Sequence, residues 1–196
     1  MIRELSIVLP YGRLHGALER SEANRCLILM VRARPGAADG ALTASLVSRG
    51  YAVLHFALLT AQEAQFPDAG MNIPKLSQRL LKILELIHFD AELQDFPLTV
   101  LASGEATPVA IRAAAQRDVQ VKVLICHGGL ADRAGRESLQ ALAAPFLMLT
   151  DPDEPLEQQA FERASTYLRG EYQAVVLTDE GPVPPIAQWL SKHFPR

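Results

Sequence analysis

The chain has 196 residues, of which 49% are hydrophobic and 21% charged, and its formal net charge at pH 7 is −3. This composition excludes a disordered chain and fits one domain over residues 1–196. The slight negative charge and the lack of a basic cluster give no reason to expect nucleic acid or an acidic membrane surface as a partner. No stretch approaches the roughly 20 apolar residues of a membrane span, and the N-terminus lacks the apolar core of a signal peptide, so we expect a cytoplasmic protein.

The first segments predict a hairpin that leads into alternating strands and helices. Residues 5–9 and 14–18 are short alternating runs, which favour an antiparallel pair. Residues 26–31 form a continuous apolar run, typical of a parallel strand covered on both faces. The later elements are predicted, in chain order, as a helix ending at Gly50, a strand at 51–58, a helix at 75–87, a strand and Ala-rich helix within 96–117, strands at 121–126 and 145–149, a helix at 156–168, a strand at 172–177 and a helix at 186–193. This order predicts an α/β fold with a mixed, mostly parallel sheet and helices on both faces.

Residues 96–117 predict a buried strand that turns abruptly into a helix, the arrangement of a nucleophile elbow. An elbow presents one side chain at its apex and needs small residues two positions before and after it, usually as Gly-x-Ser-x-Gly. That pattern is absent here, and two registers remain open. If Gly104 is at the apex, no side chain can attack a substrate. If Ser103 is at the apex, its flanking residues Leu101 and Glu105 would crowd the turn.

Several further segments carry a resemblance to a known family; they are residues 48–54, 58–63, 110–115, 128–135, 144–149 and 153–155. In order and spacing, the chain resembles the dienelactone-hydrolase-like branch of the α/β-hydrolase family over nearly its whole length. The resemblance implies a single-domain α/β-hydrolase fold with an N-terminal antiparallel hairpin. It also implies a serine or cysteine hydrolase whose triad follows the order nucleophile, acid, histidine, with Asp153 in the position of the acid. Asp153 could equally belong to a solvated turn before a helix.

The histidine that the resemblance implies is missing from its expected loop, residues 178–185. His193 falls in the right order but late in the terminal helix. His127 follows a buried strand at the sheet edge where open α/β folds place their sites, so it could act as the base for Ser103, with Asp153 orienting it. The alternative is that His127 is a packed or partly exposed histidine without a catalytic role.

The loop after the first parallel strand also departs from the family, which has a His-Gly oxyanion motif there. The sequence has Arg32 and Arg34 followed by Pro35, so an amide donor is lost and two cations are gained. These arginines could hold an anion or could simply face solvent. Glu105, at a helix N-terminus, could bind a cationic ligand or act as an acid or base, or it could only stabilise the helix.

We therefore expect a family member that has lost the catalytic triad and is non-catalytic, with a pocket near Arg32, Gly104, His127 and Asp153 that binds a small molecule or a partner. One alternative is a weak serine esterase or lactonase that uses Ser103, Asp153 and a histidine. Another is an anion-binding module that uses Arg32 and Arg34. We expect no cofactor and no metal, because Cys26 and Cys126 lie in apolar runs without a nearby histidine pair. A homodimer is left open.

Overall fold

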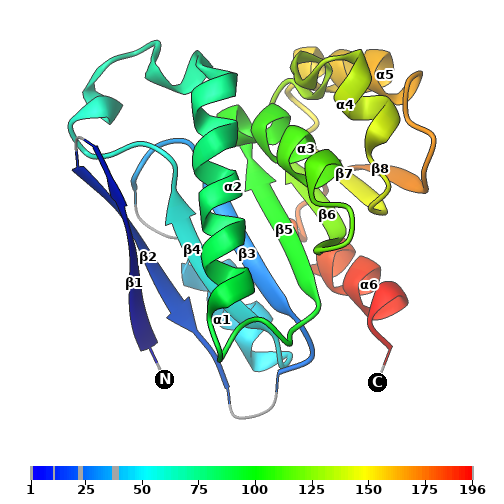
Figure 1. The fold of residues 1–196 in the computed structure, drawn as a ribbon. Helices are drawn as coiled ribbons and strands as arrows, with labels where there is room; N and C mark the ends of the chain where they lie inside the picture. Colours follow the sequence, from blue (N-terminus) through cyan, green and yellow to red (C-terminus); the bar gives the residue numbers. More distant parts are fainter. Residues whose placement is uncertain (1, 11, 22–23, 37–39, 196) are drawn as a thin grey trace.

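The computed structural model describes every residue except 1, 11, 22–23, 37–39 and 196. The described residues form one eight-stranded sheet in the order β1-β2-β4-β3-β5-β6-β7-β8 (Figure 1). The strands are β1 (Ile2–Leu9), β2 (Gly12–Glu19), β3 (Leu27–Arg32), β4 (Ala52–Ala57), β5 (Leu98–Ser103), β6 (Val121–His127), β7 (Phe146–Thr150) and β8 (Tyr172–Val176). The helices are α1 (Gly40–Ser48), α2 (Ile73–Phe89), α3 (Thr107–Gln116), α4 (Arg136–Ala141), α5 (Pro155–Ser165) and α6 (Val183–His193).

The sheet is mixed in the way the sequence predicts. β1 pairs antiparallel with β2, and β2 pairs antiparallel with β4. From β4 to β8 every neighbouring pair is parallel. The hairpin strands are longer than predicted, since Ile2 already pairs with Glu19. Both of these end residues lie outside the buried core, so hydrophobic alternation does not mark them.

Helices cover both faces of the sheet, because the parallel strands from β3 to β7 are largely apolar and buried on both sides. Along β3, Leu27, Leu29 and Val31 belong to a core that includes buried residues of α2, α3 and α5. Ile28 and Met30 point the other way, into a smaller core with α1 and α6. The predicted α/β architecture is therefore confirmed, and the carboxyl ends of the parallel strands meet at one edge of the sheet.

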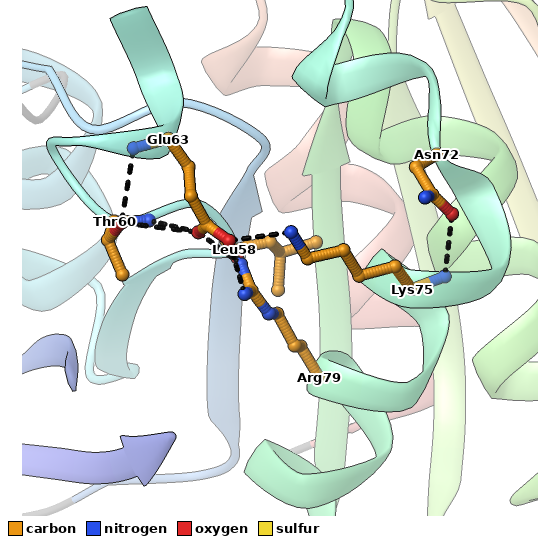
Figure 2. A network of polar contacts seen from close by, with 6 residues as sticks. All are labelled: Leu58, Thr60, Glu63, Asn72, Lys75 and Arg79. Atoms are coloured by element: carbon orange, nitrogen blue, oxygen red, sulfur yellow. Dashed lines mark hydrogen bonds and ion pairs between the residues drawn. The ribbon is translucent and has the colours of Figure 1, made fainter. Parts of the chain in front are cut away.

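The segment that follows β4 is fixed to α2 by a compact polar network (Figure 2). The two carboxylate oxygens of Glu63 accept hydrogen bonds from Arg79 Nη1 and Nη2 at 2.6 and 2.7 Å, and Lys75 Nζ donates to the same carboxylate at 2.6 Å. Thr60 donates its backbone N–H to Glu63 at 3.0 Å, and Arg79 also donates to the carbonyl of Leu58 at 2.6 Å. Hydrogen bonding by Arg79, outweighing desolvation, holds the pKa of the Glu63 carboxyl well below its ordinary value, with Lys75 adding to the effect.

Candidate functional site

The elbow after β5 has Gly104 at its apex. Ser103 is still in extended conformation, with φ −134° and ψ 142°, whereas Gly104 has φ +56°. A left-handed backbone is the strained conformation that the apex of a nucleophile elbow requires, and glycine adopts it without steric cost. Of the two registers that the sequence leaves open, the structure therefore has the one with no apical side chain. A Cβ added at Gly104 would meet nothing within 4 Å, so the site has room for a larger residue.

A second glycine turn packs directly against the elbow. Gly129 has φ +83°, and a Cβ added there would lie 2.0 Å from the carbonyl oxygen of Gly104. The Thr107 hydroxyl donates to the carbonyl of Gly128 at 2.7 Å and so ties the first turn of α3 to this loop. The backbone N–H of Gly129 donates to Glu157 Oε1 on α5 at 2.5 Å. Gly128 has φ +70°, and a Cβ added there would lie 2.9 Å from Glu157 Oε2, so both positions after β6 favour glycine.

Polar residues from neighbouring strands form a row on the α1 and α6 side of this edge. In the sheet register Ser103 lies opposite Arg32 on one side and opposite His127 on the other. Side chains at paired positions of parallel strands point to the same face. His127 Nε2 lies 3.3 Å from Asp151 Oδ2, directly after β7. Within the described chain no hydrogen bond joins Ser103 to His127.

The two other proposed triad residues lie apart from this row. Asp153 is exposed, and in the part of the chain that the structure describes the carboxylate beside His127 is Asp151. His193 Nε2 lies 4.0 Å from Glu171 Oε1, and Glu171 directly precedes β8. That contact places His193 at the amino ends of the parallel strands, away from Ser103 at their carboxyl ends.

Two adjoining cavities lie over the elbow. The larger, of about 560 Å³, is lined by Arg32, Ala33, Arg34, Pro35, Gly36, Ser103, Gly104, Glu105, His127, Gly128, Asp151, Glu154 and Glu157. The smaller, of about 360 Å³, has an apolar wall formed by Pro67, Met71, Ile73, Pro108 and Leu130. Both are lined by Gly104, Glu105 and Glu157, so they meet at the apex of the elbow.

Arg34, a proposed anion ligand, donates hydrogen bonds to other groups of the protein. Its guanidinium donates to the carbonyls of Ala64, Phe66 and Pro67 at 2.8, 3.2 and 2.6 Å. Its Nε also donates to Glu105 Oε2 at 3.0 Å. Arg34 therefore holds the loop before α2 against the elbow and neutralises Glu105. Arg32, the other proposed anion ligand, lines the larger cavity together with Arg34.

The thiol nearest the elbow is not available as a nucleophile. Cys126 pairs with Ala102 in the sheet and is fully buried. Burial raises the pKa of its thiol to about 12, against the opposing effect of a hydrogen bond with Thr107, so the thiolate is scarce near neutral pH.

Among the described residues no group of three histidine, cysteine or carboxylate side chains is placed to hold a metal ion. No described helix combines the length and apolarity that crossing a bilayer requires.

Sequence reasoning did not assign three carboxylates that line the larger cavity, Asp151, Glu154 and Glu157. Asp151 carried a usable signal, because it comes directly after a buried parallel strand whose carboxyl end had to reach the same edge. Glu157 carried none, because its place beside Gly129 depends on how α5 packs across the loop after β6.

Comparison with solved structures identifies the fold. A dienelactone hydrolase from Anabaena variabilis superposes with a TM-score of 0.84 at 20% identity, covering 99% of this chain and 96% of that one. The chain has the α/β-hydrolase fold. Est1E from Butyrivibrio proteoclasticus gives 0.75 at 10% identity with 96% of both chains covered. A cold-adapted esterase from an Arctic intertidal metagenomic library gives 0.76 at 15% identity, with 98% of this chain and 94% of that one covered. The fold is thus dienelactone-hydrolase-like.

Comparison of sequences gives less. No family model matches the chain. Proteins from two strains of Mycobacterium tuberculosis, each named "Putative phosphoribosyl transferase", are 26% identical over 132 residues, which is 67% of this chain. The chain spans only about 30% of the length of these curated relatives.

Proposed function

We propose that this α/β-hydrolase-fold chain has lost the catalytic triad and binds a small molecule in the cavities over the elbow. The observation that carries the proposal is Gly104, which occupies the apex where a hydrolase of this fold presents its nucleophile. The sequence of the loop after β8, residues 178–185, supports it, because that loop contains no histidine. Without an apical nucleophile or a loop base, the edge keeps its shape but lacks the groups that attack an ester.

The two cavities suit a ligand with a polar part and an apolar part. Asp151, Glu154 and Glu157 offer acceptors in the larger cavity, while Met71 and Leu130 offer apolar contact in the smaller one. Concave sites that combine an apolar wall with a few convergent polar groups are the usual form of a small-molecule site. We assign the ligand head to the side of Asp151 and its apolar group to the side of Leu130.

Two assays test the absence of hydrolysis. The purified protein and its Ser103→Ala variant are compared for hydrolysis of p-nitrophenyl acetate, and both are treated with a fluorophosphonate probe and analysed by mass spectrometry. We expect equal background rates and no adduct. A rate that disappears in Ser103→Ala, together with an adduct on Ser103, would refute the loss of catalysis.

Binding is tested by thermal-shift titration with a library of amphiphilic metabolites. We expect a saturable stabilisation of the wild-type protein that is weakened at least about tenfold in Leu130→Trp, which fills the apolar cavity. Val119→Trp, at a position that is 78% exposed and outside both cavities, is the matched control. If no library member gives a saturable shift, or if both variants weaken binding equally, the cavity assignment is wrong.

A second candidate is a weak serine esterase or lactonase that uses Ser103. The observation in its favour is that Ser103 and His127 are direct register partners and that Asp151 lies beside His127. Asp151 would then orient the histidine in place of Asp153. Because Nε2 of His127 faces Asp151, Nδ1 would have to take the proton from Ser103. The adduct on Ser103 described above is the result that would favour this candidate.

A further inference from the structure

The strand β8 forms one edge of the sheet (Figure 1). Four of its five residues are exposed, and Val175 is half-buried. The side chains of Tyr172 and Val176 are 45% and 50% exposed. None of the five residues, Tyr-Gln-Ala-Val-Val, carries a charge. A strand with this composition is expected to be covered, since an exposed uncharged edge strand is a template for pairing with another strand.

The free backbone groups of β8 follow from its pairing with β7. Phe146 lies opposite Tyr172 in a parallel register, with Phe146 N–H donating to Glu171 O and Leu177 N–H donating to Thr150 O. In a parallel ladder the bonded residues then alternate, so Gln173 and Val175 face β7. The N–H and C=O groups of Tyr172, Ala174 and Val176 therefore point outward, at the open edge.

The opposite edge of the sheet is protected in a way that β8 is not. β1 carries Arg3 and Glu4, and Arg3 forms ion pairs with Asp90 and Glu92 at 2.6 and 3.4 Å. Charged residues of this kind keep an edge strand from pairing with another molecule. The two edge strands thus differ in charge: β1 carries charged residues, whereas β8 carries none.

We propose that β8 pairs antiparallel with β8 of a second copy of this chain, around a twofold axis at Ala174. In this register Ala174 lies opposite its own copy, and Tyr172 lies opposite Val176 of the second copy. Every outward N–H and C=O of the three residues is then bonded, because they are the alternate residues that an antiparallel pair uses. Two eight-stranded sheets become one continuous sheet.

The side chains make this surface complementary to itself. Tyr172 and Val176 of the second copy form an aromatic and β-branched cross-strand pair, which is among the favourable pairs in sheets. Beyond the strand, Arg169 and Asp179 stand at opposite ends, both exposed and without an ion-pair partner in the described chain. The same twofold axis brings Arg169 of one copy towards Asp179 of the other, at both ends of the interface. Such isologous matching favours a second copy over an unrelated protein. This inference is independent of the ligand proposed above.

Sedimentation velocity over a range of concentrations tests the proposal on the whole chain. We expect the wild-type protein to sediment at twice its chain mass of 21.4 kDa. Val176→Lys should weaken the dimer at least about tenfold, because it places a charge opposite Tyr172 of the second copy. Val8→Lys is the matched control, since Val8 is 68% exposed on the other edge strand. It should leave the dimer intact.

A charge exchange tests the register. Arg169→Glu should weaken the dimer, and adding Asp179→Arg to the same chain should restore it. If Val176→Lys does not fold, Ala174→Pro serves the same purpose, because it removes an outward N–H and none of those that bond to β7. A monomeric wild-type protein at every concentration would overturn the proposal. So would a dimer that survives Val176→Lys and dissociates with Val8→Lys, or a double exchange that fails to restore what Arg169→Glu weakened.

Discussion

Replacing Glu63 by Gln removes the charge at the centre of the network between the β4–α2 segment and α2. The Arg79 side chain is only 11% exposed and loses one of two hydrogen bonds to a carboxylate, whereas Lys75, 43% exposed, can turn to water. A hydrogen bond to a charged group is worth about 1.5–3 kcal/mol, and an exposed ion pair about 0–1 kcal/mol. We therefore expect Glu63→Gln to lower the free energy of unfolding by about 2–3 kcal/mol.

Thermal and urea unfolding monitored by circular dichroism measure this loss. For a chain of this length about 2–3 kcal/mol corresponds to a fall in Tm of roughly 4–12 °C. Glu85→Gln is the matched control, because Glu85 is exposed on α2 and its side chain makes no hydrogen bond or ion pair with a described residue. We expect the control to stay within about 0.5 kcal/mol of the wild type.

The pH dependence of the free energy of unfolding tests the same network independently. Because the folded-state pKa of Glu63 lies below its ordinary value of 4.5, the stabilisation is present above pH 4.5 and is lost as the pH falls towards the folded-state pKa. The stability difference between wild type and Glu63→Gln should therefore narrow below pH 4.5. A difference that stays constant across that range, or a variant as stable as Glu85→Gln at pH 7, would refute the account of the network.

Three further experiments test the glycine turns and the burial of the two thiols. Gly129→Ala should lower Tm by the equivalent of about 3 kcal/mol or more of unfolding free energy, because its Cβ would overlap the carbonyl of Gly104. Gly181→Ala is the control, with φ +72° and nothing within 4 Å of the added Cβ, and should cost only about 1–2 kcal/mol. Equal losses in thermal unfolding would contradict the packing of Gly129 against Gly104. Burial raises the pKa of Cys26 and Cys126 to about 12, so neither should react with Ellman's reagent at pH 8 before unfolding, and a rapid native reaction would show an open core. Gly104→Ser should fold with a cost of about 1–2 kcal/mol in urea unfolding and still give no p-nitrophenyl acetate hydrolysis; a rate that depends on His127 would mean that a base remains in reach.

The fold could be predicted from the sequence because burial on one or two faces leaves a periodic signal. Residues 26–31 are apolar at every position because both faces of β3 are covered. Helix α4, Arg136–Ala141, was not predicted, because it has six residues and one buried side chain, Leu139, and such a short element shows no period. Pattern reasoning works where an element buries a face and fails where it does not.

At the site, the sequence predicts where residues gather but not how each one is used. The carboxyl ends of β5 and β6 had to meet, so Ser103 and His127 could be placed together before the structure was known. The elbow register depends on a single φ angle at Gly104, which no side-chain pattern reports. The role of Arg34 depends on carbonyls some 30 residues along the chain, at Ala64 and Phe66. Contacts between residues so far apart in the chain produce no recognisable spacing in the sequence.

The packing of the elbow does not depend on a side chain at its apex. The approach of Gly129 to the Gly104 carbonyl fixes the turn by packing, and the Thr107 hydrogen bond holds α3 in place. None of these contacts uses a side chain at position 104. A serine would fit there, since an added Cβ meets nothing within 4 Å. The loss of catalysis that we propose would therefore leave the backbone of the elbow unchanged, because packing against Gly129 and the hydrogen bond of Thr107 hold it.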